Sequence, residues 1–187
     1  MCGRLNVIDD PLNQLVSDML GLSFNAKTNT DLCPSQQVAT LCYNQQVLQQ
    51  NANWGIQPDW SKKLLINAKV ETVVTKPTFR QAFEFGRCLI PCNGWYEWQT
   101  KESGKQKYLF AEQQNRPLFM AGILYGNYQQ AQVVTLTQAA NQQCSAYHHR
   151  MPLLIDEQDI QTWFLSASHE VISKLADNEP KLVIQSC

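Results

Sequence analysis

Residues 87–98 read RCLIPCNGWYEW, and this stretch decides the fold. It contains two apolar runs, 88–91 and 95–98, on either side of Asn93-Gly94, a pair that is typical of tight turns. Apolar runs this short, bounded by turn residues, predict strands rather than helices. The rest of the chain repeats this pattern with few interruptions.

Working outward from this stretch, predicted strands outnumber predicted helices. A hairpin is predicted at residues 38–50, and further strands are expected at residues 64–66, 107–111, 118–124, 132–136, 151–155 and 182–184. Residue types that start helices precede three other segments, at Asp10-Pro11, Thr78 and Asp156. Because strands and helices do not alternate regularly, this order predicts an α+β fold. No linker or internal repeat is visible, so residues 1–187 are expected to form a single compact domain.

The composition is that of a packed globular protein, because 44% of the 187 residues are hydrophobic and 17% are charged. Disordered chains have fewer apolar residues and more net charge, so this class is excluded. No apolar run approaches the roughly 18 residues that a membrane span needs. The start, MCGRLNVIDD, has no apolar core typical of a signal peptide, so we expect an intracellular protein without membrane contact.

The formal net charge of −1 argues against a protein held on nucleic acid by its overall charge. The distribution is uneven, however. Residues 62–116 hold ten Lys and Arg against five Asp and Glu, whereas residues 1–61 hold two against five and residues 117–187 hold three against six. The middle segment forms either a local basic face or an unevenly charged solvated surface, and both interpretations stay open.

The seven cysteines do not follow the spacing of a disulfide scaffold, and in an intracellular protein most are expected to be reduced. Cys88 and Cys92 form a close pair, but no second pair and no His stand at metal-ligand spacing from them. We therefore expect no metal site and no cofactor.

Cys2 is the first residue suited to chemistry. Removal of the initiator Met would leave a mature N-terminal cysteine, which carries an α-amine beside a thiol. Such an aminothiol condenses with an aldehyde to a Schiff base that closes to a thiazolidine, or it acts as an N-terminal nucleophile. The position alone favours the interpretation that Cys2 merely follows the initiator Met and has no chemical role.

Three further positions are ambiguous. Asn67 stands where an apolar run meets polar residues, so it is either a buried hydrogen-bonding group or a turn former. Glu97 has aromatic neighbours; desolvation there would raise its pKa and suit acid–base catalysis, but strand alternation equally allows it to face solvent. His148 is either a proton shuttle or a partly exposed structural residue. Since adjacent strand residues face opposite ways, at most one of His148 and His149 is expected to enter a site.

Together these residues form an ordered set of motifs. The motifs are Cys2-Gly3-Arg4, Asn67-Ala68-x-x-Glu71-Thr72, RCLIP at 87–91 leading to Gly94-Trp95-Tyr96-Glu97-Trp98, and His148-x-Arg150-Met151-Pro152. In this order they resemble the SOS response-associated peptidase (SRAP) family, and the resemblance covers nearly the whole chain. It implies a β-barrel-like core with a few peripheral helices, a positively charged groove, and recognition of abasic sites in single-stranded DNA.

The resemblance also implies a reaction. The mature chain would start at Cys2, whose amine and thiol form a thiazolidine with the ring-opened sugar and so crosslink protein to DNA. Asn67 would hydrogen-bond the thiazolidine and the nucleophile, Glu97 would promote ring opening, and His148 would transfer protons at the sugar. The residues implied to contact DNA are Arg4 on a phosphate, Trp60 stacked beside the lesion, Pro34 as a second wedge, Lys69 and Arg150.

Two departures from the family bear on DNA affinity more than on the covalent chemistry. Lys69 stands where the family usually has Arg, which keeps the charge but loses the bidentate fork. The region after Trp163 is short, so elements that line one side of the groove are expected to be trimmed.

The sequence therefore predicts a monomeric, intracellular and nucleoid-associated sensor that caps abasic sites covalently through Cys2, with the peptidase and lyase-like activities that the family implies. Two other functions stay open. One is a thiol autopeptidase or protease with Cys2 as nucleophile, and the other is a module that binds damaged DNA without a covalent step.

Overall fold

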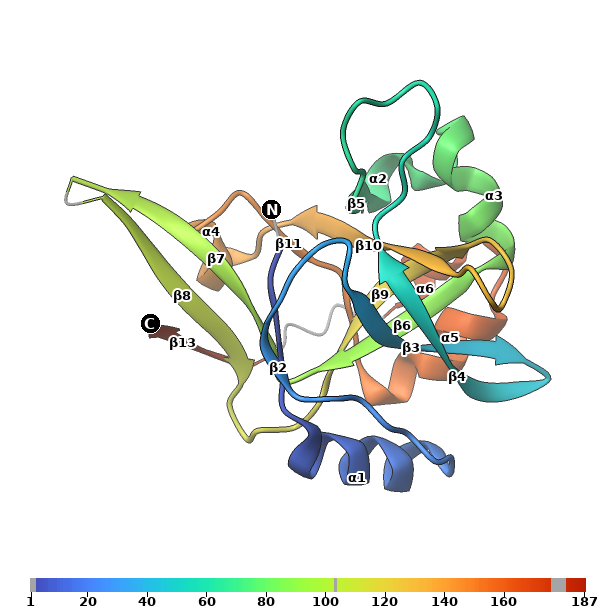
Figure 1. Ribbon diagram of the computed structural model, residues 1–187, viewed down its shortest axis with the longest axis horizontal. Helices are drawn as coiled ribbons and strands as arrows, with labels where there is room; N and C mark the ends of the chain where they lie inside the picture. Colours follow the sequence, from blue (N-terminus) through green and yellow to red (C-terminus); the bar gives the residue numbers. More distant parts are fainter. Residues whose placement is uncertain (1–2, 103, 176–180) are drawn as a thin grey trace.

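The computed structural model describes residues 3–102, 104–175 and 181–187, which form two sheets with short helices around them (Figure 1). The helices are α1 (Asp9–Leu20), α2 (Val70–Val73), α3 (Pro77–Phe85), α4 (Gln142–Ser145), α5 (Ile160–Leu165) and α6 (Val171–Lys174), with a 3₁₀ turn at Glu157–Asp159. The strands are β1 (Leu5–Val7), β2 (Asn29–Leu32), β3 (Gln37–Asn44), β4 (Gln46–Trp54), β5 (Asn67–Lys69), β6 (Arg87–Cys92), β7 (Gly94–Lys101), β8 (Gly104–Glu112), β9 (Leu118–Tyr125), β10 (Gln132–Ala139), β11 (Arg150–Pro152), β12 (Leu154–Ile155) and β13 (Leu182–Ser186).

Five strands of the larger sheet close into a ring. The order around the ring is β10, β4, β3, β6 and β9, and β9 pairs again with β10. The β10–β4 pair is parallel and the other four pairs are antiparallel. Side chains of these strands such as Leu41, Leu89 and Met120 are fully buried and belong to the hydrophobic core. The predicted α+β fold with a barrel-like core is confirmed.

The second sheet has the order β13, β8, β7, β1, β2 and is antiparallel throughout. Its β7–β8 hairpin projects from the body as an arm at the left of Figure 1. The two strands predicted in the stretch 87–98 are both present, but they are not partners, since β6 lies in the ring and β7 in the second sheet. The predicted turn at Asn93-Gly94 therefore joins strands of two different sheets.

Asn93 and Gly94 make the crossing between the two sheets. The side-chain oxygen of Asn93 accepts a hydrogen bond from the Ile8 amide at 2.7 Å, and the Asn93 amide donates to the carbonyl of Asn6 at 3.0 Å. A Cβ on Gly94 would lie 2.3 Å from the carbonyl oxygen of Phe110. Asn93 thus bonds to β1 and to the residue that follows it, and Gly94 allows β8 to lie close to the backbone at the start of β7.

Some element boundaries differ from the predictions. The strand predicted at 64–66 is an isolated bridge at Leu65, and β5 begins only at Asn67. The strand predicted at 151–155 is divided between β11, which pairs with β10, and β12, which pairs with β9. Thr78, predicted as the cap of α3, lies inside the helix, which starts at Pro77 with Lys76 at the cap position, because proline suits the first turn of a helix.

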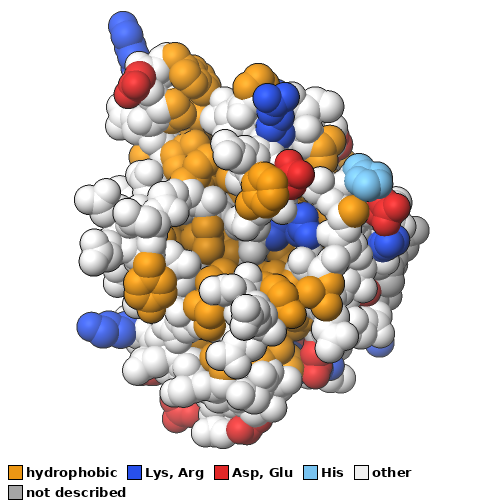
Figure 2. Space-filling model, turned by 90° about the vertical axis from the view of Figure 1, so that its right-hand side faces the viewer, with side chains coloured by type: hydrophobic (Ala, Val, Ile, Leu, Met, Phe, Trp, Pro, Cys, Tyr) orange, Lys and Arg blue, Asp and Glu red, His pale blue; other side chains and the backbone are white. Residues whose placement is uncertain are grey.

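The helices α3 and α5 pack against the ring through β6. Figure 2 shows the side of the molecule that lies at the right of Figure 1. Hydrophobic side chains gather on this face, and the Lys and Arg side chains described there are scattered rather than joined into a strip. The predicted basic groove is not visible on this face (Figure 2).

Arg87 ties these two helices to the ring. Its guanidinium donates hydrogen bonds to the carbonyls of Trp163 at 2.7 Å, Ser166 at 2.6 Å and Phe83 at 3.1 Å. It also lies over the rings of Phe83 and Trp163, 5.6 and 5.8 Å from their centroids. Carbonyls near helix ends lack partners within their own helix, so a planar fork with several donors suits this position.

We predict that Arg87→Lys lowers the free energy of unfolding by about 2–3 kcal/mol, because one ammonium cannot replace a fork that bonds several carbonyls. Urea denaturation followed by circular dichroism measures the change. Arg80→Lys, on the exposed side of α3, is the matched control and should change stability by less than about 0.5 kcal/mol. Equal effects of the two substitutions would contradict this role of Arg87.

Candidate functional site

The candidate site is assembled on β10. Its C-terminal half pairs in parallel with β5 and antiparallel with β11. Thr135 stands opposite Asn67, and Thr137 stands opposite both Lys69 and Pro152. Two motifs that are far apart in the sequence are thereby held against one strand.

Asn67 lies half-buried at the first position of β5. The Thr135 hydroxyl donates a hydrogen bond to its side-chain oxygen. The Thr135 amide donates to the carbonyl of the preceding residue, Ile66, at 3.0 Å. Since Thr135 binds the oxygen of this side chain, the amide is oriented with its NH2 group as the remaining, donating end. Asn67 is thus part of a paired strand rather than a turn former.

Arg150 begins β11 and is only 8% exposed. Its guanidinium donates two hydrogen bonds to the Glu71 carboxylate, at 2.6 and 2.8 Å, and one to the carbonyl of Thr137 at 2.6 Å. The bonds from Arg150 lower the pKa of Glu71. They also join α2, β10 and β11 beside Asn67 and His148. The guanidinium of Arg150 is thus engaged inside the protein. A contact between Arg150 and DNA stays a prediction.

His148 lies half-buried just before β11. Its Nδ1 is 2.9 Å from the backbone nitrogen of Arg150 and 3.1 Å from the carbonyl oxygen of the same residue. The N–H suits an unprotonated Nδ1 and the carbonyl suits a protonated one, so the ring keeps a partner in either state. Burial lowers the pKa of His148, and the charge of Arg150 acts in the same direction. Both effects favour a neutral ring at pH 7.

Glu97 is 3% exposed on β7, whereas the neighbouring Trp98 is 36% exposed. Of the two orientations considered for Glu97, the structure shows the inward one. Burial raises the pKa of Glu97, while the charge of His149 acts in the opposite direction. A carboxyl group in this setting keeps its proton closer to neutral pH than an exposed glutamate does, as a general acid requires.

Aromatic side chains bring the arm that carries Glu97 against the histidine segment. Tyr108 is the cross-strand partner of Glu97, and Tyr147 packs edge-on against Tyr108 with ring centroids 4.7 Å apart. The side chain of Gln99 donates to the carbonyl of Ala146 at 2.7 Å. Glu97 and the histidines are therefore held on the same side of the arm.

Cys2 lies outside the described residues. Two residues later, the carbonyl of Arg4 accepts a hydrogen bond from the Tyr96 amide at 3.0 Å, so this part of the chain runs along β7 next to Glu97. The Arg4 guanidinium lies 3.5 Å from the Asp31 carboxylate, which also binds Lys107 at 3.0 Å. The Arg4 side chain is 35% exposed, and its contact with phosphate stays a prediction.

The remaining residues proposed to contact DNA lie at the surface. Trp60 is 69% exposed in the loop between β4 and β5, beside a hollow of about 490 Å³ that Pro77 and Tyr125 also line. Lys69 is exposed at the end of β5, and Pro34 is half-buried in the turn between β2 and β3. A role in DNA binding stays a prediction for all three.

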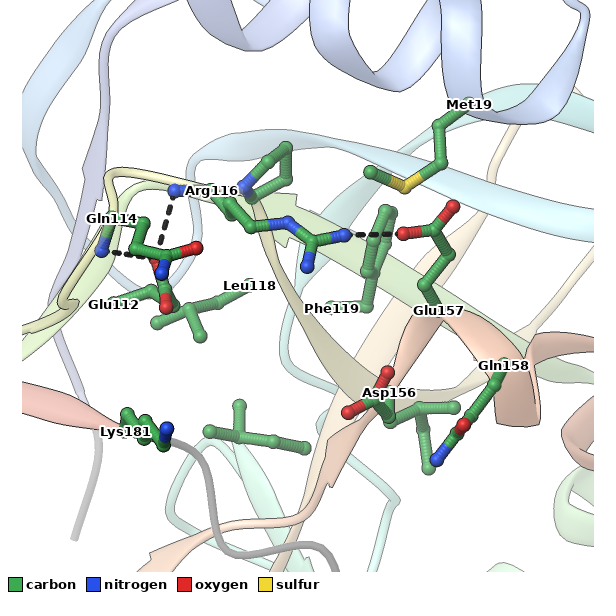
Figure 3. Close-up of a pocket in the computed structure, with 13 residues that line it drawn as sticks. Met19, Glu112, Gln114, Arg116, Leu118, Phe119, Asp156, Glu157, Gln158 and Lys181 are labelled. Carbon is green, nitrogen blue, oxygen red and sulfur yellow. Dashed lines mark hydrogen bonds and ion pairs between the residues drawn. The ribbon is translucent and has the colours of Figure 1, made fainter.

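A separate cavity of about 420 Å³ lies at the start of β9 and along β12 (Figure 3). Arg116 and Glu157 point toward each other there and form an ion pair. None of the residues predicted for the site lines this cavity. Among residues 3–102, 104–175 and 181–187, no three His, Cys, Asp or Glu side chains come together as metal ligands.

Residues 1–185 match the family described as SOS response associated peptidase (SRAP). The chain belongs to this family. Among curated relatives, the abasic site processing protein YedK of Escherichia coli is 31% identical over 115 residues, which cover 59% of this chain and 52% of YedK. The abasic site processing protein YoaM of Bacillus subtilis is 25% identical over 184 residues, covering 87% and 78%. The abasic site processing protein HMCES of Gallus gallus is 28% identical over 144 residues, covering 59% and 43%. The match thus spans about half of YedK.

Solved structures share the fold. A protein of Bordetella bronchiseptica superposes with a TM-score of 0.84 at 20% identity, covering 100% of this chain and 99% of that one. A phage-related protein of the same species gives 0.82 at 22% identity, covering 100% and 94%. The fold of this chain is built mainly of strands, and no helix in its described part is long and apolar enough to cross a membrane.

Two residues of the site, Thr135 and Glu71, had no predicted role, and Arg150, which was predicted to contact DNA, has in addition a structural role that was not predicted. Thr135 is a hydroxyl within an apolar strand, a signal that could have drawn attention to it. Glu71 and Arg150 carry opposite charges in two of the motifs, which could have indicated their pairing. The rings of the two adjacent histidines do not face opposite ways, because the chain bends at His149 and the strand begins only at Arg150. Whether one or both of them enter the site stays a prediction.

Glu71→Gln should lower the free energy of unfolding at pH 7 by about 1–2 kcal/mol, because it leaves the buried Arg150 without its counter-charge. We expect less than for a fully buried pair, since the Glu71 side chain is 47% exposed. Its folded pKa is lowered, so the stabilisation is present above the ordinary glutamate pKa and is lost as pH falls through the folded value.

Urea denaturation at several pH values between 7 and 3 tests this prediction. The difference between wild type and Glu71→Gln should narrow as the pH falls below about 4.3. Glu84→Gln, an exposed glutamate on α3, is the control. A gap that stays constant with pH would contradict the assignment.

Proposed function

We propose that this chain recognises abasic sites in single-stranded DNA and closes on them covalently through Cys2. The observation that supports the proposal is that β5, which begins with Asn67, and β11, which follows His148, pair with the same strand β10. Glu97 on β7 lies near enough to His149 for the charge of that residue to lower its pKa. The relatives YedK, YoaM and HMCES, all named abasic site processing proteins, support it. The mature chain is proposed to start at Cys2.

The covalent chemistry needs an aldehyde, which an abasic sugar offers when its ring opens. The α-amine of Cys2 adds to the aldehyde carbon, and loss of water gives a Schiff base. The thiol sulfur then bonds to the same carbon, and the thiol proton passes to the nitrogen, so a thiazolidine forms with one water as the by-product. Nothing is oxidised or reduced.

The site residues fit the proton transfers of this sequence. Burial raises the pKa of Glu97, which can therefore supply a proton to the oxygen that leaves the sugar carbon. His148, whose pKa burial lowers, accepts a proton from the incoming nucleophile. The NH2 group of Asn67 holds the intermediate by hydrogen bonds. Environments that move two pKa values in opposite directions divide the acid and base roles in this way.

The DNA strand is proposed to run past Trp60 and Lys69. The hollow beside Trp60 offers room for a base to stack on the exposed indole, an interaction worth roughly 1–3 kcal/mol per base. Lys69, at the end of the strand that carries Asn67, would bind a phosphate next to the lesion. Arg4, Pro34 and Arg150 are proposed as further contacts, and a monomer acting inside the cell on the nucleoid stays a prediction.

Two alternatives remain distinguishable by mass spectrometry. A thiol autopeptidase or protease with Cys2 as nucleophile would cleave peptides, and a non-covalent module would leave DNA and protein separable. Intact mass after incubation with an abasic oligonucleotide or with peptide separates the three. The same measurements would reveal a peptidase activity as cleaved peptide and a lyase activity as a cleaved DNA strand.

The sharpest prediction separates the amine from the thiol of Cys2. Cys2→Ala keeps the amine, so it should form a Schiff base with abasic DNA that borohydride traps, but no heat-stable crosslink, because the thiol needed for ring closure is gone. A denaturing gel with and without borohydride measures both products.

Two other cysteines give matched controls for this experiment. Cys33→Ala and Cys187→Ala remove thiols from the β2–β3 turn and from the end of the chain, and both variants should crosslink like wild type. A heat-stable crosslink formed by Cys2→Ala would refute the thiazolidine and point to a lysine such as Lys69 as the reactive amine.

Glu97→Gln and His148→Ala should each slow crosslink formation or reversal by roughly 100-fold, because each removes a proton-transfer group at the sugar. Time courses with abasic single-stranded DNA measure the rates, and circular dichroism checks the fold. His169→Ala, at an exposed histidine beside Glu170, is the control. Wild-type rates in both directions for Glu97→Gln and His148→Ala would remove both residues from the mechanism.

A further inference from the structure

His149 stands out as a titratable residue at the site to which the proposed mechanism assigns no role. Its ring stacks on that of His148, with centroids 4.4 Å apart and planes inclined by 27°. His149 is exposed, whereas His148 is half-buried. The bend at His149 places both rings on one side of the chain, and its carbonyl is held by the Ala140 amide at 3.1 Å.

We propose that His149 is a positioning residue for His148, and that the two stacked rings carry at most one proton between them near neutral pH. Two imidazolium rings at stacking distance repel each other, so protonation of one opposes protonation of the other. The neutral, outer ring of His149 then covers the flat face of His148 while the proton is on the inner ring. The part of this inference that concerns catalysis rests on the proposed function.

The charges around the pair support this sharing. The charge of His148 is the largest cause that lowers the pKa of His149, and burial is the largest cause that lowers the pKa of His148. Other elements add both signs of charge: the groups that face His149 are Lys69 on β5, Arg150 on β11 and Glu97 on β7. The positive charge of Arg150 is largely matched by Glu71, which it binds through two hydrogen bonds. The carboxyl group of Glu97 opposes the repulsion when it is ionised, and burial raises its own pKa.

The backbone of Arg150 makes the shared proton useful. Because its N–H and its carbonyl both lie within hydrogen-bond distance of Nδ1, His148 gains or loses a proton without losing its place. A neutral His149 lets His148 accept a proton during the reaction, whereas a charge on His149 would oppose that proton. The charge of His149 thus influences the pH at which His148 becomes protonated.

The test is an NMR titration of the imidazole Cε1–H signals, which needs no DNA. The chain has three histidines, so three signals are followed. His149→Phe keeps a flat ring for stacking but removes the charge, and we expect the midpoint of His148 to rise by about 0.5 pH unit or more. His149→Lys, with a permanent charge at the same place, should keep the midpoint at or below the wild-type value.

The third histidine provides the control. His169 is 77% exposed and lies 3.5 Å from Glu170, so its midpoint should be the same in all variants. His169→Phe should leave the midpoint of His148 unchanged. Identical midpoints for His148 in wild type and His149→Phe would overturn the proposal, and thermal melting confirms that each variant is folded.

Crosslinking rates measured against pH then test the catalytic part. In His149→Phe, the acid limb of the pH–rate profile should shift to higher pH by the same interval as the NMR midpoint of His148. A profile that stays in place while the midpoint moves would overturn the role in catalysis. Failure of wild type to crosslink at any pH would instead overturn the proposed function and leave the NMR result to decide on proton sharing.

Discussion

The site depends on the bonds that Arg150 makes to Glu71 and Thr137. A charged group this deeply buried is costly to desolvate, and removing one partner of such a pair leaves the other charge uncompensated. The guanidinium therefore constrains geometry, because its donors satisfy a carboxylate from α2 and a carbonyl from β10 at fixed angles. β5 and β11 are each only three residues long. Strands this short gain little from their own pairing, so the bonds of Arg150 hold them in place.

The electrostatic character of the site follows from this arrangement. Glu71 matches much of the charge of Arg150 at close range, so the site gains a rigid support with little net charge. Burial then moves the pKa values of His148 and Glu97 in opposite directions, because it disfavours the charged form of each side chain. It lowers the pKa of His148 and raises that of Glu97. A neutral base and a protonated acid can therefore coexist closer to pH 7 than the same side chains would in water. The proton transfers that the proposed reaction needs are those that such a pair supports.

The secondary structure was largely predictable from the sequence, and the pairing of strands was not. Short apolar runs bounded by polar residues mark strands because one side of each run must be buried. Nothing local says which strand lies next to which, so the sequence could not show that the turn at Asn93-Gly94 joins strands of two different sheets. The direction of Glu97 was undecidable for a similar reason, since aromatic neighbours on both faces of β7 make either face a candidate for burial. The stacking of His149 depends on a backbone bend that no residue type in the motif predicts.

The C-terminal strand shows how the second sheet supports chemistry that it does not perform. β13 pairs with β8 along its full length, from Leu182 opposite Glu112 to Ser186 opposite Tyr108. It thereby covers the edge of β8, and β7, which carries Glu97, lies in the interior of the sheet. An edge position would leave one row of backbone groups of β7 open to solvent and to foreign strands. Instead, β1 occupies the other side of β7 and continues from the segment in which Arg4 bonds to Tyr96. The pairing of β13 with β8 and of β1 with β7 thus holds the strand that carries Glu97 in the interior of the five-stranded sheet.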